Sequence, residues 1–142
     1  MNAYSQLFAT RNALGLPDEA TEEAFRRMAF NVMARNYDDH TKSFSFCLKQ
    51  GQGWELAPAY EITFVHNPRG EWTHQQLMSV NGKFQNFGRE DLLAEASRFG
   101  VGTARAVLAQ VGDAIAQWPG FADTAGVSAA QGKAIQAQFI RL

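Results

Sequence analysis

The sequence predicts a mainly α-helical fold with one small β-hairpin, built as a single domain over residues 1–142. Apolar residues recur at helical spacing through most of the first 36 residues, and again from residue 89 onward. Between these regions, residues 44–56 alternate apolar and polar side chains around a Gly-Gln-Gly turn, which is typical of a hairpin. A chain of 142 residues is also close to the commonest size of one domain.

The first helix is expected over residues 3–14. Tyr4, Leu7 and Phe8 share one face of it, and Gly15-Leu16-Pro17 ends it.

A longer helix is expected from about Glu19 to Asn36, with Asp18 as its N-cap. Its buried face is predicted by apolar residues that recur every four positions, namely Ala24, Met28 and Val32.

The middle of the chain predicts extended structure. Phe44, Phe46 and Leu48 indicate a half-buried strand, which Gly51-Gln52-Gly53 turns back along Trp54-Glu55-Leu56. Residues 65–83 predict a long excursion with local strands. Within it, Asn81-Gly82 is a strong signal for a type I′ turn.

The remainder is expected to be helical. Residues 89–99 predict an amphipathic helix. From Thr103, the apolar positions predict one helix that includes Trp118 and stops at Pro119-Gly120. Ser128 with Gln131 forms a capping-box signature for a last helix, which carries Ile135 and Phe139.

Composition excludes several classes of function. A net charge of −1 offers no field for a nucleic-acid backbone, so no direct nucleic-acid partner is expected. No apolar run approaches the roughly 20 residues of a membrane span. The first residues lack the features of a signal peptide, and the lone Cys47 cannot form an internal disulfide. These features favour a cytoplasmic location.

Asp38, Ser43 and Glu61 follow an order that phosphoryl-transfer enzymes use. In protein kinases a catalytic-loop aspartate is followed five residues later by a metal-binding asparagine, and then by a metal-binding aspartate. The order here predicts Asp38 as the catalytic proton acceptor and Ser43 and Glu61 as metal ligands. The alternative is that Asn36, Asp38 and Asp39 merely end a helix and cap a turn, as such residues often do.

Two neighbours of Asp38 are candidates for supporting roles. We expect His40 to orient the loop, although it could instead be a base or a packed core residue. Lys42 could neutralise phosphate charge or be a solvated lysine. His40, His66 and His74 lack the spacing of a zinc site. Asn81-Gly82-Lys83 lacks the Walker pattern of a phosphate loop, so a hairpin is the first interpretation.

These residues resemble a known family. Residues 30–46, with the run Asn36-Tyr37-Asp38-Asp39-His40-Thr41-Lys42-Ser43, look like the catalytic segment of HipA-like serine/threonine kinases, the toxins of bacterial toxin–antitoxin pairs. Leu56-Ala57-Pro58-Ala59-Tyr60-Glu61 is similar to the metal-binding segment of that family, usually Leu-Ala-Pro-x-Tyr-Asp. Met78-Ser79-Val80-Asn81-Gly82-Lys83 resembles a segment seen downstream in many members. The combination is specific, and the likeness extends over nearly the whole chain.

The resemblance implies a kinase-like C-terminal lobe that uses ATP and Mg²⁺ to phosphorylate a protein serine or threonine. Asp38 matches the catalytic aspartate of the family. Ser43 stands where the family has a magnesium-binding Asn, and Glu61 stands where it has a magnesium-binding Asp. Because serine is shorter than asparagine and glutamate is longer than aspartate, we expect weakened magnesium binding.

The resemblance covers only the C-terminal portion of these kinases. We therefore expect the nucleotide-gripping N-terminal lobe to be absent, and phosphoryl transfer by the chain alone to be weak or lost. Two alternatives stay open: one half of a split kinase, completed by a partner chain that bears the N-terminal lobe, and a non-catalytic module that engages an antitoxin or a sibling kinase. An isolated lobe should also expose apolar surface, which favours self-association.

Overall fold

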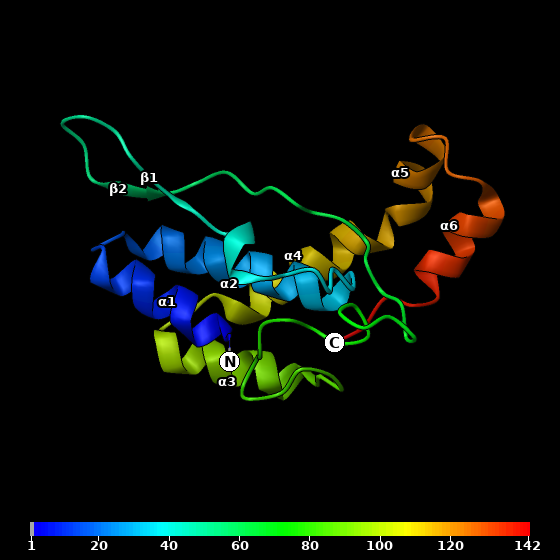
Figure 1. Ribbon diagram of the computed structural model, residues 1–142, viewed down its shortest axis with the longest axis horizontal. Helices are drawn as coiled ribbons and strands as arrows, with labels where there is room; N and C mark the ends of the chain where they lie inside the picture. Colours follow the sequence, from blue (N-terminus) through cyan, green and yellow to red (C-terminus); the bar gives the residue numbers. More distant parts are fainter. Residues whose placement is uncertain (1) are drawn as a thin grey trace.

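The computed structural model describes residues 2–142 and confirms a mainly α-helical protein with a two-stranded antiparallel hairpin. In chain order the elements are α1 (Tyr4–Ala13), α2 (Asp18–Met33), a 3-10 turn (Thr41–Ser43), β1 (Phe46–Leu48), β2 (Trp54–Leu56), α3 (Arg89–Phe99), α4 (Ala104–Ala116), α5 (Trp118–Thr124) and α6 (Ala129–Gln136). Figure 1 shows α5 and α6 gathered at one end of the molecule and the hairpin projecting from the other. None of the helices in residues 2–142 combines the length and apolar character needed to cross a bilayer.

Helix α2 is the central element, because α1, α3 and α4 all contact it (Figure 1). The four-residue repeat predicted from the sequence faces inward, and Ala24, Met28 and Val32 are buried. The core around them also takes its largest side chains from the neighbouring elements, namely Tyr4, Phe8, Met78, Val80, Leu92 and Val107. Burial of this apolar surface is the main force that holds the helices together.

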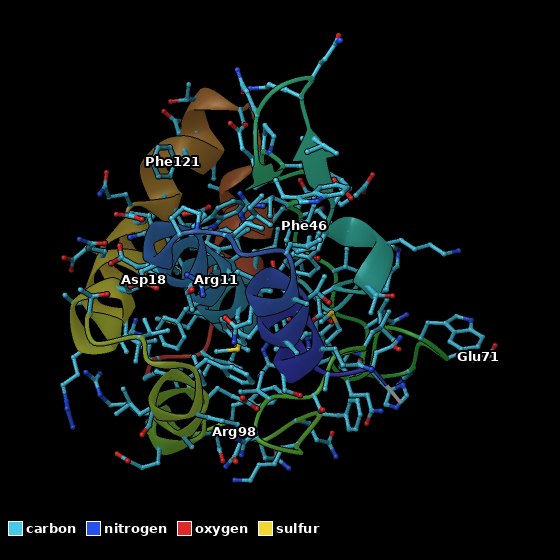
Figure 2. The ribbon with its side chains drawn as sticks, turned by 90° about the vertical axis from the view of Figure 1, so that its left-hand side faces the viewer. Arg11, Asp18, Phe46, Glu71, Arg98 and Phe121 are labelled. Atoms are coloured by element: carbon cyan, nitrogen blue, oxygen red, sulfur yellow. The ribbon has the colours of Figure 1, made fainter. Side chains whose placement is uncertain are left out.

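The start of α2 differs from the prediction. Pro17 is the N-cap, and Asp18 is the first helical residue rather than the cap. The Asp18 carboxylate instead forms an ion pair with Arg11 of α1, at 2.9 Å between Oδ1 and Nη2 (Figure 2). A carboxylate in the first turn also interacts favourably with the positive end of the helix dipole.

The end of α2 also differs, since the helix stops at Met33 and not at Asn36. The amide of Asn36 donates to the carbonyl of Asn31, and the amide of Arg35 donates to the carbonyl of Val32. This pair of bonds is the Schellman motif, in which the residue after the cap adopts a left-handed conformation. Arg35 has that conformation, with φ of 54°.

The C-terminal region contains a helix that the sequence did not predict. Pro119 does not stop a helix, since α4 has already ended at Ala116 and Pro119 lies in the first turn of α5. Proline suits that position because first-turn amides need no partner within the helix. The predicted cap of α6 is confirmed, as the Ser128 hydroxyl accepts a hydrogen bond from the Gln131 amide.

The predicted hairpin is confirmed, and it pairs Phe46 with Leu56 and Leu48 with Trp54. Leu48 was expected to be half-buried but is 57% exposed, because the tip of a two-stranded hairpin has no layer packed on it. The local strands predicted over residues 65–83 are wrong, since this part of the described chain makes only isolated bridges.

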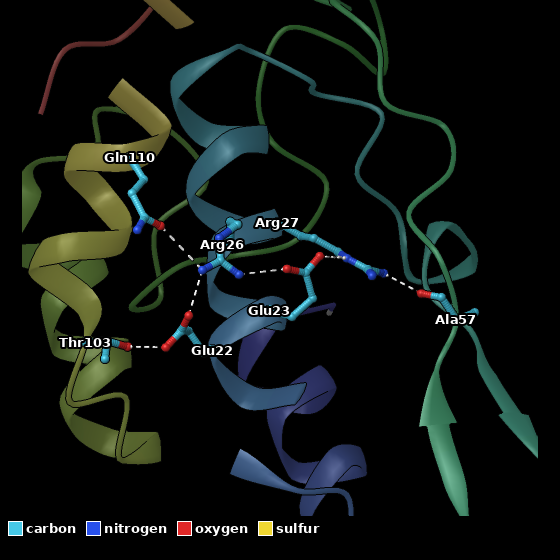
Figure 3. A network of polar contacts seen from close by, with 7 residues as sticks. All are labelled: Glu22, Glu23, Arg26, Arg27, Ala57, Thr103 and Gln110. Carbon is cyan, nitrogen blue, oxygen red and sulfur yellow. Dashed lines mark hydrogen bonds and ion pairs between the residues drawn. The ribbon is translucent and has the colours of Figure 1, made fainter. Parts of the chain in front are cut away.

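An ion-pair network on α2 fixes the segment that follows the hairpin (Figure 3). Glu23 accepts a hydrogen bond from Arg27 Nε at 2.8 Å, and Arg27 Nη1 donates to the Ala57 carbonyl at 2.8 Å. On the other side of the network, the Thr103 hydroxyl donates to Glu22. The start of the 57–61 segment is thereby tied to the middle of α2.

The type I′ turn at Asn81-Gly82 is confirmed. Asn81 and Gly82 have φ of 49° and 76°, and Val80 and Lys83 exchange two backbone hydrogen bonds. Asp91 of α3 anchors the turn, because its buried carboxylate accepts hydrogen bonds from Asn81 Nδ2 and from Lys83 Nζ.

Replacement of Asp91 by asparagine is expected to lower the free energy of unfolding at neutral pH by about 1–2 kcal/mol, since hydrogen bonds to a carboxylate are lost. Burial by itself raises the pKa of Asp91, but the hydrogen bonds from Lys83, Gly88 and Asn81 outweigh it and lower the pKa. This stabilisation is therefore present above the ordinary value of 3.8 and is lost as the pH falls through the lowered pKa. Urea denaturation of the wild type and of Asp91→Asn should show a gap in the free energy of unfolding that closes only in acid. A gap that is the same at pH 7 and pH 3 would contradict the assignment.

Candidate functional site

The candidate site is formed by two segments that run side by side after α2. The Tyr37 amide donates to the Val65 carbonyl at 3.0 Å, and the Val65 amide donates to the Arg35 carbonyl at 3.1 Å. The Tyr60 hydroxyl donates to the Lys42 carbonyl at 2.7 Å. These bonds hold the loop that carries Asp38 against the segment that carries Glu61.

Asp38 presents a carboxylate that is about half exposed, with 48% of its side-chain surface accessible. Its Oδ1 atom lies 3.9 Å from His40 Nε2. The other ring nitrogen of His40 lies 3.3 Å from the Ser43 hydroxyl, so the imidazole bridges the two ends of the loop. The His40 ring therefore contacts both Asp38 and Ser43, and the Asp38 carboxylate stays accessible to solvent.

Ser43, which the sequence order predicted as a metal ligand, is buried within the loop. Only 7% of its surface is exposed, and its hydroxyl lies 3.5 Å from the Asp38 carbonyl and close to His40. The 3-10 turn from Thr41 to Ser43 directs the hydroxyl inward in this way. Lys42, on the same turn, is exposed.

Glu61 is exposed and has a left-handed backbone, with φ of 53°. Such a conformation is costly for a residue other than glycine and persists only where its surroundings impose it. The Asn36 side chain supplies that restraint, because its Nδ2 atom donates to the Glu61 carbonyl at 2.9 Å. Among residues 2–142, the Glu61 carboxylate makes no hydrogen bond or ion pair.

Magnesium is the metal that this order of residues would suggest, and the donor set does not fit it well. Mg²⁺ needs near-ideal octahedral oxygen ligands. Glu61 offers an unpaired carboxylate, but the Ser43 hydroxyl faces the loop interior. The described chain also contains no cluster of three His, Cys, Asp or Glu side chains that could hold a metal ion.

Asp39 has a role that sequence reasoning missed. Its side chain is fully buried and accepts hydrogen bonds from Gln76 Nε2 at 2.9 Å, from the Leu77 amide at 2.8 Å and from the Met78 amide at 3.4 Å. Burial raises the pKa of Asp39, and the neighbouring Tyr4 hydroxyl together with these hydrogen bonds offsets only part of the rise. Asp39 therefore anchors the loop to the core while Asp38 faces outward.

A chain of buried polar groups extends this anchor to Glu61. The Tyr4 hydroxyl accepts from Asn31 Nδ2 at 3.0 Å, and Asn31 Oδ1 accepts from Asn36 Nδ2 at 3.0 Å. Burial raises the pKa of Tyr4, and the neighbouring Asp39 carboxylate raises it further. No local pattern reveals this network, because Tyr4 lies on a predicted apolar face and its partners are distant in the sequence.

The family model of the HipA-like C-terminal domain matches residues 1–118. This chain belongs to the HipA-like C-terminal domain family. The match includes α1 to α4, the hairpin and both segments of the candidate site, whereas α6 and nearly all of α5 lie beyond it. No curated protein and no solved structure matches the chain.

Proposed function

We propose that this HipA-like chain is the acceptor-binding lobe of a protein serine/threonine kinase, with little or no transfer activity by itself. The observation that carries the proposal is the backbone pairing between the Asp38 loop and the Glu61 segment, which keeps Asp38 half-exposed on a restrained loop. Phosphoryl transfer depends mainly on such positioning.

In this proposal Asp38 accepts the proton of a serine or threonine hydroxyl, and His40 holds the loop through its contacts with Asp38 and Ser43. ATP is the phosphoryl donor that the family resemblance suggests, and Lys42 would neutralise part of the negative charge of its phosphates. Transfer is weak because Ser43 turns its hydroxyl away from the site, which leaves Glu61 as a lone metal-binding side chain. The resemblance also extends the proposal to a toxin that an antitoxin restrains.

Titration with ATP in the presence and absence of Mg²⁺ tests this proposal by calorimetry. Because the donor set fits Mg²⁺ poorly, ATP should bind weakly at most, and a dependence of that binding on Mg²⁺ that is lost in Glu61→Ala would support the proposal. The matched control is Glu55→Ala, an exposed glutamate of the hairpin, which should bind as the wild type does. With a separate N-terminal lobe of a HipA-like kinase added, transfer should fall by about 10²–10⁴ in Asp38→Asn, the range typical of a lost general base.

A non-catalytic binding module is the second candidate. It is favoured by exposed apolar side chains on the hairpin and the segment after it, namely Leu48, Trp54, Tyr60 and Ile62. Leu48 and Trp54 are paired across the hairpin, and exposed apolar groups that lie together often mark a contact with another protein. Absence of ATP binding, together with binding to an antitoxin or a second copy that Asp38→Ala leaves unchanged, would replace the kinase proposal with this one.

A further inference from the structure

A polar pocket of about 300 Å³ lies beside the bridge that joins the two site segments. Its polar lining comes from three parts of the chain that are distant in the sequence, namely Arg35, Tyr37, His66, His74, Gln85 and Asn86. No aspartate or glutamate lines it. The pocket therefore contains one fixed positive charge, several groups able to donate hydrogen bonds, and no negative charge.

Arg35 supplies that charge and has only neutral partners. Its Nη1 atom donates to the Tyr37 hydroxyl at 2.9 Å and lies 3.4 Å from His66 Nε2. Its Nε atom donates to the Gln138 carbonyl. Arg35 takes part in none of the ion pairs found among residues 2–142, and neither does the partly buried Arg89, whereas the partly buried Arg11, Arg26 and Arg27 each have a carboxylate partner.

The contacts with Tyr37, His66 and Gln138 fix the guanidinium in place without neutralising it. A half-buried charge without a counter-ion is unfavourable, because it loses part of its hydration in a medium of low polarity and no opposite charge replaces it. The ion pairs of other arginines show that carboxylate partners are present elsewhere in this fold. A structural tether alone therefore does not account for the lack of acidic groups in the pocket.

The backbone supports a specific role for two lining residues. Arg35 and Asn86 both have left-handed conformations, with φ of 54° and 56°. Glycine adopts that conformation without steric cost and asparagine adopts it more readily than most residues, whereas a residue such as arginine is strained by about 1 kcal/mol or more. Glycine would therefore be the less costly residue at both positions. Each position nevertheless carries a polar side chain, and both residues line the same pocket.

We propose that this pocket binds a phosphate group, carried either by a small molecule or by a phosphorylated side chain. The Arg35 guanidinium would make charge-assisted hydrogen bonds with the phosphate oxygens, and the Tyr37 hydroxyl and the Gln85 and Asn86 amides would complete the ring of donors. His74 lies at the rim, with Nδ1 held 3.0 Å from the Gly70 carbonyl. The site is separate from Asp38 and Glu61, so the inference stands apart from the proposed kinase function.

The first experiment titrates the full chain with inorganic phosphate by calorimetry, at an ionic strength matched with sodium chloride. Saturable binding is expected for the wild type. In Arg35→Gln the affinity should fall about tenfold or more, as expected when hydrogen bonds from a charged donor are lost. The matched control is Arg105→Gln, an exposed arginine of α4 that lies outside the pocket. That variant loses the same charge and should bind phosphate as tightly as the wild type does.

A second variant keeps the test valid in case Arg35→Gln does not fold. Asn86→Gly removes one amide donor but suits the left-handed backbone, so it should fold at least as well and bind phosphate more weakly. The proposal is overturned if phosphate binds no better than chloride, or if Arg35→Gln and Arg105→Gln bind it equally.

A third titration, with N-acetyl-phosphothreonine amide, separates the two sources of the phosphate. Tighter binding than inorganic phosphate supports a phosphorylated side chain, and equal binding supports a small molecule. Glu61→Ala should retain phosphate affinity, so a failure of the kinase proposal would leave this test intact.

Discussion

Asp39→Ala is expected to lower the free energy of unfolding by about 3 kcal/mol or more. The Asp39 carboxylate is the shared acceptor for Gln76 Nε2 and for the amides of Leu77 and Met78, and both Gln76 and Met78 are fully buried. Each buried donor left without a partner costs about 1–3 kcal/mol. The variant would lose the hydrogen bonds that connect the Asp38 loop to the core.

The neighbouring residue provides the control. Asp38→Ala removes the same carboxylate from the adjacent position, but the Asp38 side chain is half exposed, so its effect should stay within about 0.5 kcal/mol. Guanidinium denaturation of the two variants measures the difference. Equal stabilities for Asp38→Ala and Asp39→Ala would show that Asp39 does not anchor the loop.

The pH dependence of Asp39 should be opposite to that of Asp91. Because burial raises the pKa of Asp39 in the folded state, the folded protein binds this proton more tightly than the unfolded chain does, so protonation adds to the free energy of unfolding. The Asp39 contribution therefore becomes more favourable as the pH falls through the raised pKa toward the ordinary value of 3.8. Asp39→Asn, which cannot titrate, should lack this gain.

Asn36→Ala is expected to have the second-largest effect, a loss of about 2 kcal/mol. The change removes hydrogen bonds from Asn36 Nδ2 to Asn31 Oδ1 and to the Glu61 carbonyl, each worth about 1 kcal/mol. The Asn36 Oδ1 atom is already buried without a partner, so its removal costs no further hydrogen bond. The larger consequence is local, since the left-handed backbone of Glu61 loses its restraint.

Limited proteolysis of residues 57–65 would report that local effect. The Asn36→Ala variant should be cleaved there faster than the wild type, under conditions where both are fully folded. Asn67→Ala serves as the matched control, because Asn67 is an exposed asparagine after the same segment. Equal cleavage of Asn36→Ala and Asn67→Ala would mean that Asn36 does not restrain Glu61.

The sequence predicted most of the helices and the hairpin because their information is local. The apolar repeat of α2, the cap of α6 and the turn at Asn81-Gly82 all depend on residues a few positions apart. The errors arose where local signals have two meanings. Pro119 can end a helix or begin one, and an arginine at position 35 gives no sign of the left-handed cap that glycine would announce.

For the candidate site, only the order of its residues along the chain could be predicted. The spacing of Asp38 and Glu61 indicated their use in one site, and the backbone pairing at Val65 brings their segments together. The inward turn of Ser43 could not be predicted, because it depends on the 3-10 turn and on His40. The burial of Asp39 was equally hidden, since its partners lie 37 to 39 residues away.

The separation of Asp39 from its partners has a consequence during protein synthesis. The ribosome completes α1 and α2 well before residues 76–78 emerge, and a chain grows at about 5–20 residues per second. For several seconds Tyr4, Asn31 and Asp39 must remain hydrated, since burial without Gln76 and its neighbours would leave the carboxylate unpaired. The loop that carries Asp38 therefore cannot take its final form until residues 76–78 have been translated.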